Sequence, residues 1–417
     1  MPSVTPTHVA VFLFIDLITI GFIVFVNISQ AYLMNTKLAI PESIQGTISG
    51  DLGFWSEVTI VAMVWLFGML ADKTSRRLVM SLGLAFLGAS YLAYPLSESA
   101  DGLLLSRLVY AVGVAATTCM LTVMVHDYPQ ESSRGKLVAA SGICGGFGAA
   151  MIGALGGAMP DFFVSRGASE LDAAFYMNWV AAAICIAAAA IAAVGAHPGI
   201  PGGRPAKSGF RESAAIGLRA ARRPRIRVLY FSAFAARGDL VIAGTFIVLW
   251  GTLAGQAQGL DTTVALGRGT LLFVITSITT LICAPFMGFL LDRFDRLMML
   301  AAGAVLATVG FGAVGLIENP LDPAVIPLFV LLGIGQSSCF YASQALIGQE
   351  APLENRGAVI GAFSACGAVG VLIANGIGGR LFDSIDPGAP FLMVAGATAL
   401  LAIYAVWVRL RERAQAN

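Results

Sequence analysis

Twelve long apolar stretches constrain this chain more than any other feature of its sequence. Each is roughly 20 to 25 residues long, which is enough for an α-helix to cross about 30 Å of hydrocarbon. The composition agrees, because 57% of the 417 residues are hydrophobic and only 12% are charged, against roughly 25% charged in typical soluble domains. The chain is therefore predicted to be an all-α membrane protein. The expected spans are 9–33, 50–71, 78–97, 103–126, 136–160, 174–196, 228–253, 269–291, 297–317, 324–348, 357–381 and 389–408.

A polar, arginine-rich stretch separates the first six spans from the last six. It predicts an N-terminal bundle over residues 1–197, a basic cytoplasmic linker over 198–227 and a C-terminal bundle over 228–417. With both termini inside, the cytoplasmic segments hold 19 of the 25 Lys and Arg residues, which is the bias that cytoplasmic loops normally show. We expect a multi-pass protein of the cell (inner) membrane with both termini in the cytoplasm. No basic region or cleavage site precedes the first span, so this span is expected to be retained.

A short motif at the end of a span occurs once in each half. Residues 68–77 read GMLADKTSRR, and residues 288–296 read GFLLDRFDR. Glycines recur in the same register in the spans 136–160 and 357–381. Matches in register between halves predict two six-helix bundles related by a pseudo-twofold axis along the membrane normal.

On these motifs the chain resembles the major facilitator superfamily over essentially its whole length. Further matching residues are Arg107 in the fourth span and the pairs Arg134-Gly135 and Arg356-Gly357 that open the fifth and eleventh spans. The resemblance implies alternating-access transport, in which one bundle rocks against the other around a central site. It implies a transporter that needs no cofactor, and the sequence carries no enzyme signature.

The first span also resembles that of the drug:proton antiporters, in which an acid is followed by a glycine. Here these residues are Asp16 and Gly21. The prolines typical of that group are absent from the first span and from the Gly153–Gly157 stretch of the fifth.

The acids of the repeated motif are predicted to act as conformational latches. An exposed acid facing a helix N-terminus gains about 0.3–1 kcal/mol from the unpaired N–H groups and the helix dipole. Asp72 is expected to face the start of the eleventh span, and Asp292 the start of the fifth. The alternative is that both are solvated loop charges. The predicted latch residues are Gly68, Asp72, Arg76, Arg77, Gly288, Asp292, Arg293, Arg296, Arg134 and Arg356.

Charged residues within the spans are the candidates for proton coupling. A carboxylate in hydrocarbon costs about 2.5–3.5 kcal/mol on insertion scales and is usually functional. Asp16 and Asp239 occupy matching positions in the two halves, and a low-dielectric environment favours a protonated carboxyl group. The alternatives are structural ion pairs or hydrogen bonds. Arg107 and Glu57 complete this set, and their similar depth would allow them to pair.

Polar side chains on the helices that line the cavity in this superfamily are candidate ligands of the solute. Arg237 is two residues from Asp239, so the two do not share a helix face, and it is expected to bind an anionic group or another helix. Amides and phenols can orient a polar solute, or they can join helices at about 0.6 kcal/mol per bond. The remaining candidates are Asn27, Gln30, Gln336, Tyr341, Gln344 and Asn375.

The sequence thus favours a proton-coupled secondary transporter of a small organic solute, with export of an amphipathic compound slightly preferred. Proton-coupled uptake of an organic anion and an uncoupled facilitator are the alternatives, and a sensor or assembly factor that has lost transport is a further one. The expected partners are the solute, protons and the lipid bilayer, and the protein is expected to be monomeric. The net charge of +1 suggests no nucleic-acid partner, and the three histidines and six cysteines show no metal-ligand spacing.

Overall fold

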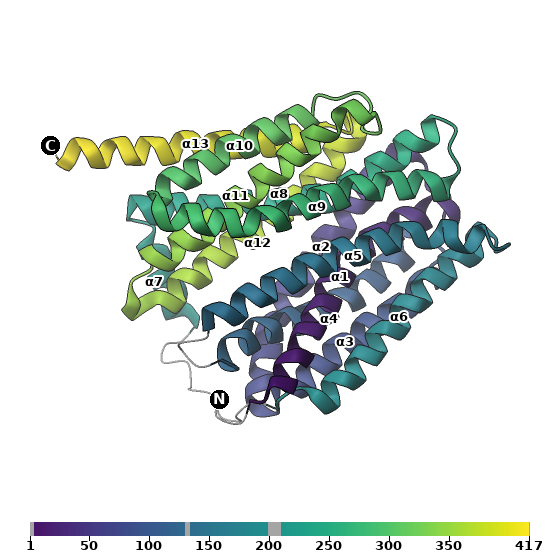
Figure 1. Cartoon of the computed structure of the whole chain (residues 1–417), viewed down its shortest axis with the longest axis horizontal. Helices are drawn as coiled ribbons and strands as arrows, with labels where there is room; N and C mark the ends of the chain where they lie inside the picture. The colour runs from purple at the N-terminus through teal and green to yellow at the C-terminus, as the bar shows by residue number, and fades with distance from the viewer. Residues whose placement is uncertain (1–3, 130–133, 199–209, 417) are drawn as a thin grey trace. The chain divides into compact units, whose positions relative to one another are not determined.

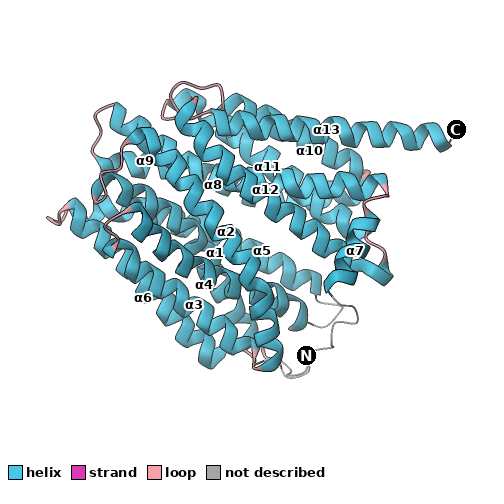
Figure 2. Ribbon diagram, turned by 180° about the vertical axis from the view of Figure 1, so that it is seen from behind, coloured by secondary structure: helices cyan, strands magenta, loops and turns pink. Residues whose placement is uncertain are grey.

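The computed structural model describes residues 4–129, 134–198 and 210–416, and within these residues all regular structure is helical (Figure 2). Twelve of the helices are long and apolar enough to cross a membrane, which confirms the expected number of spans. A thirteenth, α7, lies in the expected linker. The helices are α1 (Pro6–Thr36), α2 (Glu42–Lys73), α3 (Arg76–Ala93), α4 (Ala100–Asp127), α5 (Arg134–Val164), α6 (Glu170–Gly195), α7 (Phe210–Ala220), α8 (Pro224–Ala257), α9 (Thr262–Arg293), α10 (Arg296–Val314), α11 (Ile326–Glu350), α12 (Arg356–Ser384) and α13 (Ala389–Ala416).

Side-chain caps fix where several of these helices begin. The Thr5 hydroxyl accepts from the backbone N–H of His8 at the start of α1, and Ser75, Ser99 and Asp295 cap α3, α4 and α10 in the same way. Such caps satisfy backbone donors that have no partner inside the helix. They also explain the abrupt change from loop to helix after short polar segments.

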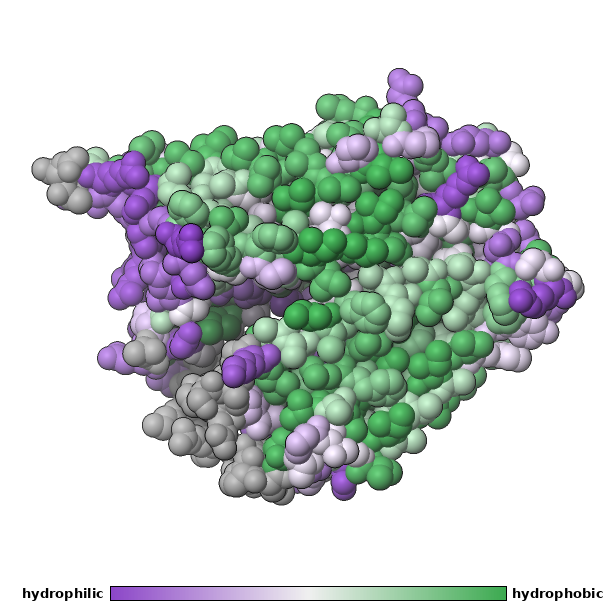
Figure 3. All heavy atoms as spheres, viewed as in Figure 1, coloured by the Kyte–Doolittle hydropathy of each residue, from purple (hydrophilic) through white to green (hydrophobic). Residues whose placement is uncertain are grey.

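The chain forms two compact units (Figure 1). Unit 1 comprises residues 1–41, 55–205 and 251–274. Unit 2 comprises residues 42–54, 206–250 and 275–417. Over the helices of each unit, apolar residues gather along the middle and hydrophilic residues at the ends (Figure 3), as expected for helices that cross a bilayer.

Glycines allow close helix contacts at matching positions in the two units. In unit 1, Gly148 of α5 lies against the carbonyl of Leu17 in α1, with no room for a Cβ atom. In unit 2, Gly370 of α12 lies in the same way against the carbonyl of Phe234 in α8. Small residues are the usual means of bringing membrane helices together, and the glycine register seen in the sequence serves this purpose.

The start of α2 is held within unit 2 by charged residues of α12. The Asp383 carboxylate accepts from the backbone N–H groups of Gly46 and Thr47. Arg380 forms an ion pair with Asp51 at 2.9 Å. These contacts fix the first turns of α2, which begins at Glu42 and so before the expected span.

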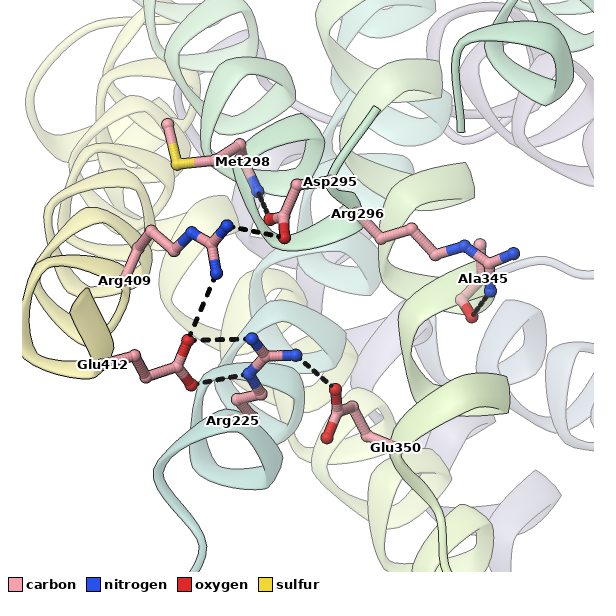
Figure 4. A network of polar contacts seen from close by, with 8 residues as sticks. All are labelled: Arg225, Asp295, Arg296, Met298, Ala345, Glu350, Arg409 and Glu412. Atoms are coloured by element: carbon pink, nitrogen blue, oxygen red, sulfur yellow. Dashed lines mark hydrogen bonds and ion pairs between the residues drawn. The ribbon is translucent and has the colours of Figure 1, made fainter. Parts of the chain in front are cut away.

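An ionic network in unit 2 joins four helices, α8, α10, α11 and α13 (Figure 4). Arg225, at the start of α8, donates from Nε and Nη2 to Glu412 of α13 at 2.6 and 2.8 Å. It also pairs with Glu350, at the end of α11, at 2.7 Å. Arg409 extends the network to Asp295, which caps α10. The bidentate geometry of the Arg225–Glu412 pair is the strong form of such an interaction.

We expect Arg225→Gln to lower the stability of unit 2 measurably. The change leaves Glu412 and Glu350 close together without their shared cation, and a partly buried network of this kind is worth about 1–2 kcal/mol. Thermal unfolding in detergent at low salt would show a decrease in Tm of a few degrees. Arg413→Gln, an exposed arginine on the same helix as Glu412, is the control, and equal Tm values for the two variants would contradict the prediction.

Candidate functional site

Asp16 is a buried carboxylate in the middle of α1. Its side chain is only 3% exposed, and the hydroxyl of Ser141 on α5 donates a hydrogen bond to Oδ2. Gly145, one turn further along α5, packs closely against α1 beside the carboxylate, since an added Cβ atom would lie 3.2 Å from Ile20 Cγ1 and 3.8 Å from Asp16 Oδ1. No cation pairs with Asp16 among the described residues, so the hydroxyl of Ser141 is the side-chain partner that the structure gives this carboxyl group.

Asp239 is the repeat-related carboxylate of α8, and it is more completely enclosed. Its exposure is 0%. The amide Nε2 of Gln336 on α11 donates to Oδ1 at a long 3.5 Å. Oδ2 has no hydrogen-bond partner in the described part of the chain. A buried carboxyl group with an unsatisfied oxygen is costly, so Asp239 is an unusual residue for the middle of a span.

Arg107 of α4 is a buried cation that donates to neutral groups of unit 1. It is 7% exposed and donates to Ser56 of α2 and to Asn27 of α1, both at 3.1 Å. Its guanidinium carbon also lies 4.9 Å from the centre of the Tyr110 ring, a favourable cation–π distance. Ser56 directly precedes Glu57, so the guanidinium lies at the turn of α2 that carries the acid proposed as its partner.

Arg237 differs from Arg107 because its side chain is exposed on α8. Its aliphatic stem packs against Gly367 of α12, where an added Cβ atom would lie 2.7 Å from Arg237 Cδ. The guanidinium forms no ion pair or hydrogen bond with any residue that the structure describes. Among the described residues, Arg237 is thus a cation within a span whose guanidinium is left uncommitted.

The other sequence-predicted ligands occupy varied environments. Gln30 is buried in α1, and Asn375 of α12 lies against Gly53 of α2 within unit 2. Tyr341 is half-buried and Gln344 is exposed on α11. Gln336 is the member of this group that bonds to a candidate coupling acid, Asp239.

Only some residues of the repeated loop motif form ion pairs, hydrogen bonds or ring contacts with other described residues. Arg76 pairs with Asp127, at the end of α4, at 2.6 Å, whereas the matching Arg296 donates to the carbonyls of Leu291 and Ala345. Arg293 lies over the ring of Phe289. The two acids of the motif, Asp72 and Asp292, are exposed, and Arg77 is half-buried. The two glycines, Gly68 and Gly288, have room for a Cβ atom. Arg356 donates to the Gly348 carbonyl, and the side chain of Arg134 lies outside the described residues.

Several residues of these sites were not predicted from the sequence. Ser141 and Ser56 are single hydroxyls in apolar helices, and nothing in their local sequence marks them. The tyrosines around Arg107 (Tyr91, Tyr94 and Tyr110) offered the only signal, because a buried phenol usually needs a polar partner. The ring centre of Tyr91 lies 6.4 Å from that of Tyr94 and 6.3 Å from that of Tyr110.

Twelve candidate spans, with buried acids and a buried cation inside them, define a multi-pass membrane protein. The family model of the Major Facilitator Superfamily matches residues 9–268 and 240–417, and the chain belongs to this family.

Comparisons with individual proteins agree with this assignment. The chain is 25% identical over 413 residues to magnetosome protein MamH of Paramagnetospirillum magneticum, covering 97% of this chain and 93% of that protein. It is 25% identical to magnetosome protein MamZ of Magnetospirillum gryphiswaldense, covering 94% of this chain but only 61% of MamZ. Multidrug resistance protein MdtG of Yersinia enterocolitica is 30% identical over 143 residues, about a third (34%) of each chain.

Solved structures of transporters share the fold. A single-residue mutant of the nucleoside transporter NupG superposes with a TM-score of 0.74 at 16% identity, covering 96% of this chain and 98% of NupG. A POT family transporter in complex with 5-aminolevulinic acid gives a TM-score of 0.70 at 12% identity, with 95% of each chain covered. At these identities the likeness concerns the fold alone.

Proposed function

We propose that this protein is a proton-coupled secondary active transporter of a small organic solute that works by alternating access in the cell membrane. The observation that carries the proposal is Asp239, a fully buried carboxyl group with one oxygen that has no partner among the described residues. Asp16 supports it as a second buried carboxyl group, bonded to a hydroxyl and not to a cation. A protonated carboxyl group is neutral and can stay buried while the bundles rock between the outward-open and inward-open states. A charged carboxylate resists that burial.

Export of an amphipathic compound is the favoured direction of transport. The antiporter-like start of α1 and the likeness to MdtG over about a third of the chain (34%) support it. In this scheme the outward-open site takes up a proton and the inward-open site exchanges it for the solute. Both termini and the basic linker lie in the cytoplasm, as the distribution of Lys and Arg indicates.

Proton-coupled uptake of an organic anion is the second candidate. It is favoured by Arg237, an exposed guanidinium without a described partner, and by Arg107, which donates to neutral groups. The two candidates differ in the charge of the solute and share the same coupling acids.

Solute-dependent proton flux in proteoliposomes tests the proposal. Vesicles loaded with a pH-sensitive dye would be given amphipathic cations, neutral amphiphiles or organic anions, with a pH gradient imposed in each direction. Proton movement that depends on one solute class, and that is reversed when the gradient is reversed, is the expected result. Solute flux without proton movement would identify an uncoupled facilitator, and absence of both fluxes for every class would contradict transport.

The latch hypothesis leads to a prediction about conformation. We expect Asp72→Asn to shift the protein toward its inward-open state, because the neutral side chain loses the attraction to a helix N-terminus that stabilises the outward-open state. Spin labels at Leu78 and Met298, exposed residues near the two loop motifs, would report longer distances. Asp161→Asn, at an exposed acid of α5, is the control, and an unchanged distance distribution for Asp72→Asn would exclude the latch.

A further inference from the structure

Unit 2 holds an apolar cavity whose lining contains none of the candidate transport residues. Its volume is about 780 Å³, and it lies between α7, the first half of α8 and the first half of α12. Lining residues include Leu218 of α7, Phe231 and Phe234 of α8, and Gly361 and Val369 of α12. Leu218 is 72% exposed and Val369 47% exposed, so the apolar wall is accessible and requires an apolar occupant.

The helix α7 is fixed beside this cavity by two specific contacts. Gly217 packs closely on α12, where an added Cβ atom would lie 2.7 Å from the Cβ atom of Ala362. The hydroxyl of Tyr230 on α8 donates to the Gly217 carbonyl at 2.8 Å. These contacts place Leu218 at the cavity. Arg219, Arg222 and Arg223 follow it in the sequence.

Exposed arginines lie close in sequence to the lining residues on α7 and α8. Arg227 precedes Phe231 by one turn on α8, so the two share a helix face. Arg222 lies two residues after the end of α7, and Arg219 and Arg223 line a neighbouring cavity of about 300 Å³. All four are exposed.

These arginines contrast with Arg225, which is committed to Glu412 and Glu350. The side chains of Arg219, Arg222, Arg223 and Arg227 form no ion pair with any described residue. The only acid of α7 is Glu212, seven residues before Arg219 and therefore roughly 10 Å away along the helix axis. The cluster thus has positive charge available for an anionic ligand.

We propose that this cavity and its arginines form a binding site for an anionic phospholipid. An acyl chain occupies the apolar cavity, whose volume of about 780 Å³ lies within the range of ligand sites. The phosphate lies at the mouth, where Arg227 and Arg222 supply charge. Basic pockets beside membrane helices recognise anionic head groups. An anionic phospholipid uses both parts of the site, whereas a free phosphate would not contact the apolar wall and a neutral lipid would not use the charge of the arginines.

Two variants separate the acyl-chain and head-group parts of the site. Gly361→Leu fills the cavity from a position where an added Cβ atom meets nothing within 4 Å, and Gly396→Leu on α13 is the matched control with the same free space. Arg227→Gln removes a charge at the mouth, with Arg413→Gln as its control. Arg227 and Gly361 are not among the candidate transport residues, so lipid binding can be measured independently of transport.

Native mass spectrometry of the whole protein in detergent would measure binding of dioleoyl-phosphatidylglycerol, dioleoyl-phosphatidylcholine and glycerol 1-phosphate. We expect phosphatidylglycerol to bind most tightly, Arg227→Gln to weaken it about fivefold without affecting phosphatidylcholine, and Gly361→Leu to weaken both lipids. Equal binding by each variant and its control would overturn the site. Equal binding of the two lipids would overturn its anionic character, and glycerol 1-phosphate binding as tightly as phosphatidylglycerol would overturn the role of the acyl chain. If Gly361→Leu does not fold, the exposed Arg227→Gln still decides the outcome.

Discussion

Asp239→Asn is expected to abolish proton-driven accumulation of the solute and to leave exchange of solute across the membrane intact. Asparagine has nearly the same shape and can still accept from Gln336 (3.5 Å to Asp239 Oδ1), but it cannot carry a proton. One pH unit is worth about 1.36 kcal/mol per proton, so one coupled proton supports about tenfold accumulation. With the same gradient of one pH unit, the variant should therefore bring the solute concentrations on the two sides of the membrane to a ratio of one.

Counterflow exchange and accumulation, measured on the same proteoliposomes, separate coupling from binding. Asp101→Asn, at an exposed acid in the first turn of α4, should behave like the unaltered protein in both assays. Tenfold accumulation by Asp239→Asn would show that another group carries the proton, and Asp16→Asn would then be the variant to examine. Loss of both exchange and accumulation, with the protein still folded, would assign Asp239 to solute binding.

The sequence was sufficient for the architecture because lipid imposes a simple rule. Every backbone group in the hydrocarbon must be bonded within its own helix, so apolar runs of adequate length become spans. The repeat predicts two related halves, whereas the two compact units also exchange residues 42–54 and 251–274 relative to the predicted boundaries. The helix ends were less predictable: α2 begins at Glu42 and α9 at Thr262, in polar residues that hydropathy does not recognise.

The helix α7 shows the same limit. Residues 210–220 lie in a segment whose arginines predict a solvated linker, and the amphipathic spacing of Leu218 and Ala214 became meaningful only with α12 beside them. The charge network around Arg225 joins residues of α8, α11 and α13, which no local pattern can bring together.

For the candidate site, the sequence identified the costly residues but not their partners. Asp16, Asp239 and Arg107 are conspicuous because charge in an apolar run is rare. Ser141 and Asn27, which bond to Asp16 and Arg107, depend on how α5 and α4 are rotated. That rotation is set by side-chain packing around the whole helix and is not visible in hydropathy.

The glycine contacts provide the largest expected effect on folding. Gly148→Leu should prevent α1 and α5 from packing, because the new side chain would meet the backbone carbonyl of Leu17, which no rotamer change can move. Overpacking against flexible side chains costs about 1–3 kcal/mol, and a clash with backbone should cost about 3 kcal/mol or more, a large share of a stability of roughly 5–15 kcal/mol. Folded protein, measured by size-exclusion chromatography and thermal unfolding in detergent, should be nearly absent.

Gly142→Leu is the matched control for this prediction. It lies on the same helix in the same span, less than two turns earlier, and an added Cβ atom there meets nothing within 4 Å. It should fold normally, since leucine favours a helix more than glycine by up to about 1 kcal/mol. The repeat predicts the same contrast in unit 2 between Gly370→Leu, beside the Phe234 carbonyl, and Gly357→Leu, which has open space. Equal yields within either pair would show that the two helices do not approach as closely as the glycine register requires.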